Sequence, residues 1–307
     1  MPATLILVSV PYLYQIPIDL KFLVIAAYAS LLHFLSFGHN SLMDYYEDMK
    51  DSSKSHHPLI TGEIGITKAH NLLHWGLIAI FITGILITIA ISPAPLMGMI
   101  FLFLFSVFGQ AYNDGLSKRS IFAFVPISAC FTSLSLWAWF LSHSNLNFIG
   151  WVLIGYFFMV ILFQISYSGC LKELEIKEES NLLIKLGARI EDGTFKGGFA
   201  ASYGIFAKSI NLALGVYLLW LSYSLMKTLW LLIVVAIASY LTYELVRTRK
   251  WNRDKTLLQM SLQEIAVLYL PIPLLLDPFT GIALMIFGVL YFFGMNKWLW
   301  SEVYPAV

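Results

Sequence analysis

Acidic side chains gather at the end of a long apolar run, residues 22–37. In the following stretch HNSLMDYYEDMKD, residues 39–51, Asn40, Asp44 and Asp48 recur every four residues. At about 3.6 residues per turn, this spacing places the three side chains on one face of a helix. Aligned carboxylates repel one another unless a cation lies between them, and Mg²⁺ prefers oxygen ligands that bridge it to a substrate phosphate. The spacing predicts a magnesium site. The alternative is a solvated helix end with incidental acids.

Basic side chains follow a later apolar run. The stretch QAYNDGLSKRS, residues 110–120, contains Tyr112, Lys118 and Arg119. A lysine ammonium and an arginine guanidinium suit a diphosphate as a point charge and a planar donor fork respectively. The alternative is that both residues anchor the helix end on the cytoplasmic side of a membrane.

A third polar cluster, YSGCLKELEIKEESNLLIKLG, covers residues 167–187. Glu175 and Glu179 repeat the four-residue spacing of the first cluster, and we predict that they are metal ligands. On an ideal helix Glu173 would point about 160° away from Glu175. If the segment stays helical, the metal ligands are therefore either Glu173 or the pair Glu175 and Glu179, but not both. The alternative for the whole cluster is an ordinary cytoplasmic helix with charges at i and i+4.

Composition indicates where the elements that hold these clusters lie. Of the 307 residues, 59% are hydrophobic and 12% are charged, and the mean hydropathy is +0.76. Soluble domains are about 45–50% apolar and about 25% charged. Because lipid cannot satisfy backbone polar groups, the long apolar runs must be helices. We therefore predict an all-α polytopic membrane bundle formed by a single domain, residues 1–307.

Nine apolar segments are long enough to span a bilayer, and a tenth is short. The nine are 18–47, 67–92, 95–113, 120–142, 147–171, 204–225, 228–247, 258–276 and 280–299, and the short one is 3–16. The opening residues lack the basic region and small-residue cleavage site of a signal peptide.

The connections between these segments alternate in charge. Four of them are basic or strongly charged, and the intervening ones are short and nearly neutral. The positive-inside rule places the charged connections in the cytoplasm, so all three polar clusters lie at the cytoplasmic rim of a bundle in the cell membrane. The net charge of +1 gives no reason to expect a nucleic-acid partner, and nothing in the sequence indicates a protein partner.

Four residues inside apolar segments have simpler interpretations. Cys130 and Cys170 are too far apart in sequence for a thiolate metal pair, so we expect buried thiols. We expect His33 to be a hydrogen-bonded residue of the bundle interior. Lys208, near the start of a segment, is expected to extend its ammonium to the membrane interface.

The first cluster resembles the opening signature of the UbiA superfamily of intramembrane prenyltransferases. That signature has Asn, Asp and Asp at four-residue spacing and then Arg-Pro-Leu-x-x-Gly, which HPLITG at residues 57–62 nearly matches. Ser41 stands where many members have another Asp, and His57 stands where they have Arg. Tyr112 and Lys118 are of the types found in the family's second motif, though they are farther apart here.

The resemblance implies Mg²⁺-dependent transfer of an isoprenyl group from a prenyl diphosphate to a lipophilic acceptor, an aromatic quinone precursor or a glycerolipid. The implied catalytic residues are Asp44, Asp48 and Lys118. The implied diphosphate-binding residues are Asn40, Tyr112, Lys118, Arg119 and Lys172, and the implied metal ligands are Asn40, Asp44, Asp48, Glu175 and Glu179.

Two features depart from the family pattern. In the third cluster the family has aspartates, and Glu173 fits the family's distance to Gly187 better than Glu175 does. The family's first span brings a basic residue to the cytoplasmic entry, and residues 3–16 have none. Either this contact is missing here, or another residue supplies it, with Lys21 and Arg189 as the expected substitutes.

Two other kinds of membrane protein also use intramembrane acids. CDP-alcohol phosphotransferases are one of them, but their Asp-Gly, Ala-Arg and Gly pattern is missing before Asp44. A secondary transporter coupled to a cation or to protons is the remaining alternative, although coupling acids usually lie near the bilayer midplane rather than at one rim.

Overall fold

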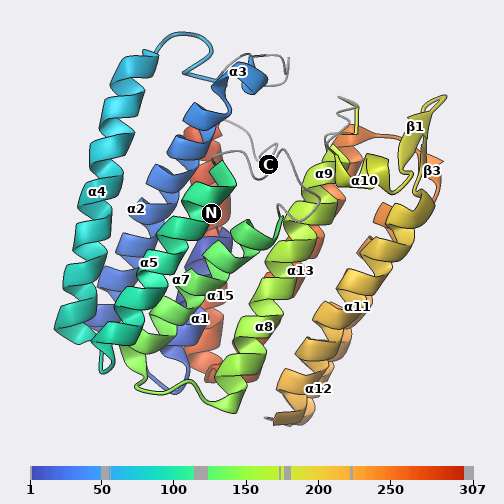
Figure 1. The fold of residues 1–307 in the computed structure, drawn as a ribbon. Coiled ribbons are helices and arrows are strands. Elements are labelled where there is room, and N and C mark those ends of the chain that lie inside the picture. Colours follow the sequence, from blue (N-terminus) through green and yellow to red (C-terminus); the bar gives the residue numbers. More distant parts are fainter. Residues whose placement is uncertain are drawn as a thin grey trace.

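The described part of the chain forms a bundle of long apolar helices with shorter helices at their ends (Figure 1). The computed structural model describes residues 2–49, 55, 57–113, 124–172, 174–175, 181–221 and 224–300. The long helices are α1 (Pro2–Leu13), α2 (Leu20–Met43), α4 (Ile66–Ile91), α5 (Pro95–Ala111), α7 (Phe124–Ser142), α8 (Phe148–Phe163), α11 (Gly198–Leu221), α12 (Leu225–Val246), α13 (Arg253–Tyr269) and α15 (Pro278–Trp300). The short ones are α3 (Tyr45–Asp48), η3 (Gln164–Gly169), α9 (Cys170–Lys172), α10 (Leu182–Lys185) and α14 (Pro271–Leu275).

The predicted number of spans is not confirmed. Every predicted segment is helical, but among the described residues seven helices are both long and apolar enough to cross a bilayer. Three others are apolar but shorter. They are Ala3–Leu13, Pro95–Ala111 and the part of α15 whose side chains are described, Pro278–Leu290. The chain is a multi-pass membrane protein with an all-α bundle, as composition predicts.

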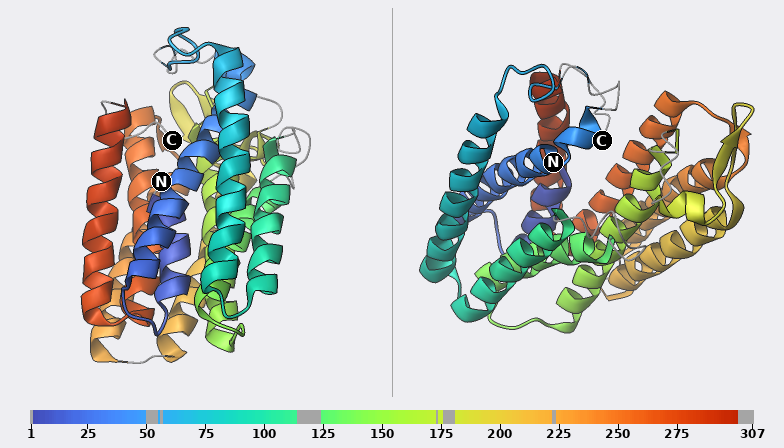
Figure 2. Two further views of the ribbon diagram at one scale, coloured as in Figure 1. Left: turned by 90° about the vertical axis from the view of Figure 1, so that its left-hand side faces the viewer. Right: turned by 45° about the horizontal axis from the view of Figure 1, so that its top comes forward.

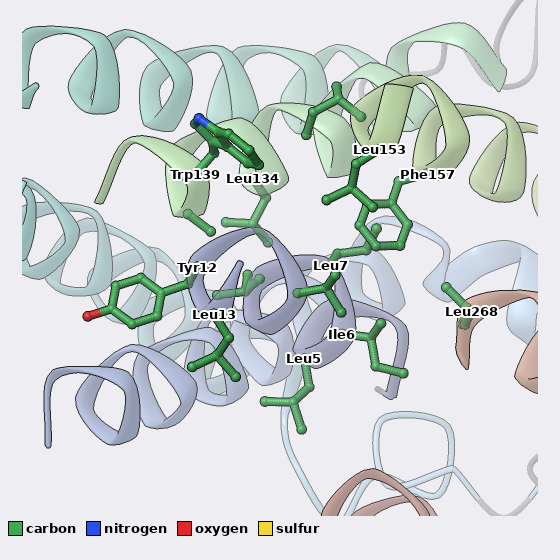
Figure 3. Packing of buried hydrophobic residues seen from close by; sticks show 14 of the residues in the cluster. Leu5, Ile6, Leu7, Tyr12, Leu13, Leu134, Trp139, Leu153, Phe157 and Leu268 are labelled. Atoms are coloured by element: carbon green, nitrogen blue, oxygen red, sulfur yellow. The ribbon is translucent and has the colours of Figure 1, made fainter. Parts of the chain in front are cut away.

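Helix α1, the segment predicted to be short, lies at the centre of the bundle. Leu5, Ile6, Leu7 and Val8 on consecutive positions are all buried, so the helix is covered on every side. Figure 3 shows these leucines and Ile6 packed among side chains of α7, α8 and α13, including Trp139 and Phe157. A helix of 12 residues is about 18 Å long, so it anchors the core without spanning a full bilayer.

Helix α4 is the opposite case. It packs against α2 and α5, and Leu72, Trp75 and Leu86 are each more than 60% exposed. In water such a face would be unstable, whereas hydrocarbon solvates it without cost. Its outer face is therefore a lipid-facing surface.

The remaining helices pack as neighbouring pairs, α5 with α7, α8 with α11 and α12 with α13. They run roughly along a common direction (Figure 2). The end that carries α3, α9 and α10 is called the rim below, and it is uppermost in Figure 1.

A three-stranded antiparallel sheet at the rim was not predicted. Strands β1 (Arg189–Glu191) and β2 (Thr194–Lys196) form a hairpin, and β2 also pairs with β3 (Arg249–Lys250). Asp192 and Gly193 make the turn with φ values of 48° and 69°, the two positive values that a two-residue Asp-Gly hairpin requires. The sheet joins the connection before α11 to the connection after α12.

Candidate functional site

The first polar cluster lies where α2 ends. The sequence predicts a helix through residue 47, but α2 ends at Met43 because Asp44 leaves helical geometry, with φ −86° and ψ 1°. Hydrogen bonds from Asp44 N to Asn40 O, 2.9 Å, and from Asp48 N to Asp44 O, 2.8 Å, continue the helical spacing across this break into α3. Asn40, Asp44 and Asp48 therefore remain on successive turns.

The side chains of this cluster interact directly. Asn40 Nδ2 donates a hydrogen bond of 2.9 Å to Asp44 Oδ2, and Asn40, Asp44 and Asp48 are all partly buried. Two carboxylates and an amide are hard oxygen donors of the kind that Mg²⁺ takes, and Mg²⁺ commonly needs only one or two carboxylates beside substrate phosphates. Within the described part of the chain, no three His, Cys, Asp or Glu side chains cluster as a metal site. The donor set thus fits a substrate-assisted magnesium site rather than an all-protein one.

The second cluster begins beside the first. Asn113 Nδ2 lies 2.9 Å from His39 Nδ1, which joins the end of α5 to the rim end of α2. Tyr112 precedes this contact and is partly buried at the C-terminal cap of α5. Lys118 and Arg119 lie outside the described residues.

The third cluster leaves helical geometry at Leu174 and Glu175. After the six-residue π-helix η3, α9 ends at Lys172, and Leu174 and Glu175 lie in a turn. The argument that Glu173 and Glu175 cannot both be ligands assumed a continuous helix, and it therefore does not hold. Glu175 is exposed and its Oε1 accepts a hydrogen bond of 2.6 Å from Trp251 Nε1. Glu173 and Glu179 lie outside the described residues, as does the side chain of Lys172.

One solved structure matches almost the whole chain. It is the apo structure of a UbiA homolog from Aeropyrum pernix K1, with a TM-score of 0.67 over 93% of this chain and 97% of that chain at 12% identity. This chain has the UbiA fold. No protein-family model and no curated protein matches the sequence. The resemblance that the first motif indicates is therefore confirmed at the level of the fold.

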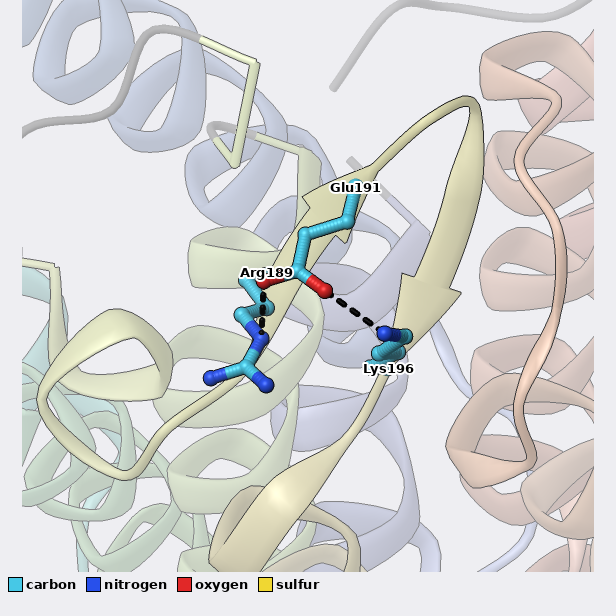
Figure 4. A network of polar contacts seen from close by, with 3 residues as sticks. All are labelled: Arg189, Glu191 and Lys196. Carbon is cyan, nitrogen blue, oxygen red and sulfur yellow. Dashed lines mark hydrogen bonds and ion pairs between the residues drawn. The ribbon is translucent and has the colours of Figure 1, made fainter.

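In this UbiA fold, the two expected substitutes for the basic residue of the first span lie at different ends of the bundle. Lys21 is in the first turn of α2, about 34 Å along the helix from Asp44. Arg189 is on the hairpin, where its Nε pairs with Glu191 at 2.7 Å (Figure 4). The expectation for Lys21 is wrong, because this residue lies at the opposite end of α2 from the rim, whereas Arg189 does lie at the rim and stays a prediction.

Two of the three expectations for the interior of the UbiA fold are confirmed. His33 is buried, with its Nδ1 2.7 Å from Thr4 Oγ1. Cys130 and Cys170 are both buried.

The expectation for Lys208 is wrong. Its side chain is only 2% exposed, and its Nζ lies 3.9 Å from the centre of the Phe163 ring. Lys208 is ten residues into α11, about 15 Å below Gly198, which is too deep for its ammonium to reach the rim. A cation–π contact replaces the interfacial water.

Sequence analysis missed the polar group that surrounds Lys208. Gln164 Nε2 donates a hydrogen bond of 2.7 Å to Glu264 Oε2, and the Glu264 carboxylate is within electrostatic range of the Lys208 ammonium. The three residues come from η3, α11 and α13 at similar depth. Ionisable groups inside a membrane usually mark functional positions. The sequence carries a signal for this group, since Lys208 and Glu264 are charged residues within the predicted apolar segments 204–225 and 258–276.

Proposed function

We propose that residues 1–307 form one intramembrane prenyltransferase domain. It transfers an isoprenyl group from a prenyl diphosphate to a lipophilic acceptor, an aromatic quinone precursor or a glycerolipid, and releases diphosphate. The observation that supports this proposal most directly is the placement of Asn40, Asp44 and Asp48 on successive turns at the rim of a UbiA fold. The contact between His39 and Asn113 supports a shared site for the first two clusters.

Each cluster has a separate role in this proposal. Asp44 and Asp48, with the amide oxygen of Asn40, would hold Mg²⁺ beside the diphosphate, and Glu175 and Glu179 would hold a second ion. The bound ion would supply compensation for the negative charge of the leaving group. The diphosphate contacts come from Asn40, Tyr112, Lys118, Arg119 and Lys172.

The chemistry requires a charged rim above a dry interior. The allylic C–O bond breaks with its electron pair leaving on the diphosphate oxygen, and basic side chains aimed at that group stabilise the developing charge. The acceptor then forms a bond to the allylic carbon and loses a proton. Water would capture the allylic cation first, so the reaction needs an apolar surrounding, such as the bundle below the rim.

The orientation in the membrane follows from the loop charges. Five basic residues lie at the rim where α12 leads into α13, namely Arg247, Arg249, Lys250, Arg253 and Lys255. By the positive-inside rule we assign the rim to the cytoplasm and the protein to the cell membrane.

The polar group around Lys208 favours a second candidate function. Lys208 and Glu264 lie at about half the depth of the bundle, where cation- or proton-coupled transporters place their coupling residues. A secondary transporter is therefore the alternative.

Activity and transport assays of the full chain in lipid separate the two. Purified protein in nanodiscs should convert a radiolabelled prenyl diphosphate to a lipid-soluble product in a Mg²⁺-dependent reaction, given an extract of lipophilic acceptors. Inorganic pyrophosphate should compete with the prenyl diphosphate. Lys118→Ala should raise the KM for prenyl diphosphate at least tenfold. Lys68→Ala, which changes an exposed lysine on α4, should leave this KM unchanged. Ion flux in proteoliposomes without any product would favour the transporter.

A further inference from the structure

A basic cavity lies at the rim where α12 passes through β3 into α13. Its volume is about 220 Å³. Its lining residues are Arg247, Arg249, Lys250, Asn252, Lys255 and Thr256. In Figure 1 this connection lies beside the β-sheet at the right, away from α2 and α3, which carry the first polar cluster. Four of the six lining residues are cations and none is an acid.

Two nearby carboxylates are paired, one with a cation of the cavity itself and one with cations of the adjoining hairpin. Glu244 holds Arg247 through both oxygens, at 2.7 and 2.9 Å. On the adjoining hairpin, Glu191 accepts from both Arg189 and Lys196, as Figure 4 shows. Within the described part of the chain, Arg249, Lys250 and Lys255 form no ion pair with a carboxylate. The cavity therefore has a surplus of positive charge.

Arg249 is the fixed element of the cavity. Its Nη2 donates a hydrogen bond of 2.9 Å to Thr256 Oγ1, and its guanidinium lies 5.6 Å from the centre of the Phe195 ring. Its Nη1 is buried and has no hydrogen-bond partner among the described residues. A buried guanidinium N–H without an acceptor is costly, so the site lacks an acceptor that the protein does not supply.

The start of α13 adds to the same positive field. Asn252 caps this helix by accepting a hydrogen bond of 2.8 Å from Lys255 N, and the helix continues for 17 residues. The N-terminus of such a helix carries a partial positive charge that favours anions. The N-terminus of α13, two lysines and the guanidinium of Arg249 thus border one cavity.

We propose that this cavity binds the phosphate group of an anionic molecule. Arginine and lysine around a helix N-terminus are the donors that phosphate oxygens accept, and a phosphate brings the missing negative charge. Two sources share this chemistry, the headgroup of an anionic membrane lipid and a free phosphate. Basic pockets at the membrane surface suit lipid headgroups. The proposal does not depend on the proposed function, because its residues belong to none of the three polar clusters.

Binding by the full chain in detergent tests the proposal. Native mass spectrometry would measure phosphatidylglycerol and phosphatidylcholine binding, and calorimetry would measure inorganic phosphate. The variant Lys250→Gln/Lys255→Gln removes two exposed cations of the cavity and leaves the contacts of Arg249 intact. Its matched control, Lys68→Gln/Lys185→Gln, removes two exposed cations elsewhere.

The cavity variant should lose affinity about 25-fold, or about fivefold per removed charge, and the control about twofold or less. Loss for phosphatidylglycerol identifies the lipid as the source, and loss for inorganic phosphate alone identifies the free anion. An equal loss of affinity in the cavity variant and in the control would overturn the proposal. It would also be overturned if the protein bound phosphatidylglycerol no better than phosphatidylcholine and did not bind inorganic phosphate.

Discussion

His39 on α2 and Asn113 at the end of α5 meet at 2.9 Å across a sequence separation of 74 residues. This contact joins two polar clusters that the sequence shows only as separate motifs. It fixes where the chain leaves α5 and so where Tyr112 lies at the rim. The pair is therefore a candidate for positioning the diphosphate-binding side chains.

The first prediction concerns this pair. Asn113→Ala should raise the KM for prenyl diphosphate about fivefold with little change in kcat, because one hydrogen bond contributes about 1 kcal/mol. His39→Ala should have a similar effect, and the double variant should be no worse than either single one. Additive effects in this cycle would mean that the contact does not position the site.

The second prediction concerns the metal. Asp44→Asn keeps an acceptor oxygen for Asn40 but removes one negative charge, so Mg²⁺-dependent turnover should fall about 100-fold or more. Thermal unfolding of the metal-free protein should change little, since repulsion with Asp48 is relieved. Glu63→Gln, an exposed carboxylate that follows the same cluster, is the control. Normal turnover in Asp44→Asn would exclude this residue as a metal ligand.

The third prediction decides the register of the third cluster. Single Glu→Gln changes preserve size and remove charge, so activity should fall in Glu175→Gln and Glu179→Gln and persist in Glu173→Gln. Trp251→Phe removes the hydrogen bond to Glu175 and should change the Mg²⁺ concentration for half-maximal activity. Loss in Glu173→Gln alone would favour the other register, and three fully active variants would mean that this cluster holds no metal.

The fourth prediction concerns the buried polar group. Lys208→Met and Glu264→Gln should each lower the unfolding temperature, because each leaves its partner uncompensated in the bundle. The double variant should recover part of the loss, with a coupling energy of about 0.5–3 kcal/mol. Fully additive losses in detergent unfolding would show that the two residues stabilise the bundle independently.

The fifth prediction concerns pH. His143 follows α7, its ring stacks on Trp139 at 4.3 Å between ring centres, and its Nε2 lies 3.1 Å from the carbonyl oxygen of Tyr14. Burial lowers the pKa of His143 below its ordinary value, and two backbone hydrogen bonds oppose this effect. The unfolded chain therefore binds a proton at higher pH than the folded chain does, so stability is highest above about pH 6.5 and falls as the pH decreases through that value.

Unfolding temperatures at pH 8 and pH 5.5 measure this effect. The decrease on acidification should be smaller in His143→Gln than in the unaltered protein. The control, His70→Gln, changes an exposed histidine on α4 and should keep the full decrease. The same pH dependence in all three proteins would show that His143 does not contribute.

Sequence predicts the bundle well because the bilayer leaves few choices for an apolar run. The break at Asp44 and the turn at Glu175 are different, since they depend on single backbone angles and on a partner, Trp251, 76 residues away. The rim hairpin does have a sequence signal, because Glu-Asp-Gly-Thr at residues 191–194 stands between two short alternating segments. Burial of Lys208 required knowing that Phe163 covers it, which no spacing reveals.

The rim sheet also restricts how the bundle can open. Strand β2 leads directly into α11 and pairs with β3, which directly follows α12. Backbone hydrogen bonds between the two strands thus connect the rim ends of α11 and α12. Moving the rim ends of α11 and α12 apart would therefore break the pairing of β2 with β3, so this end of the helix pair resists opening.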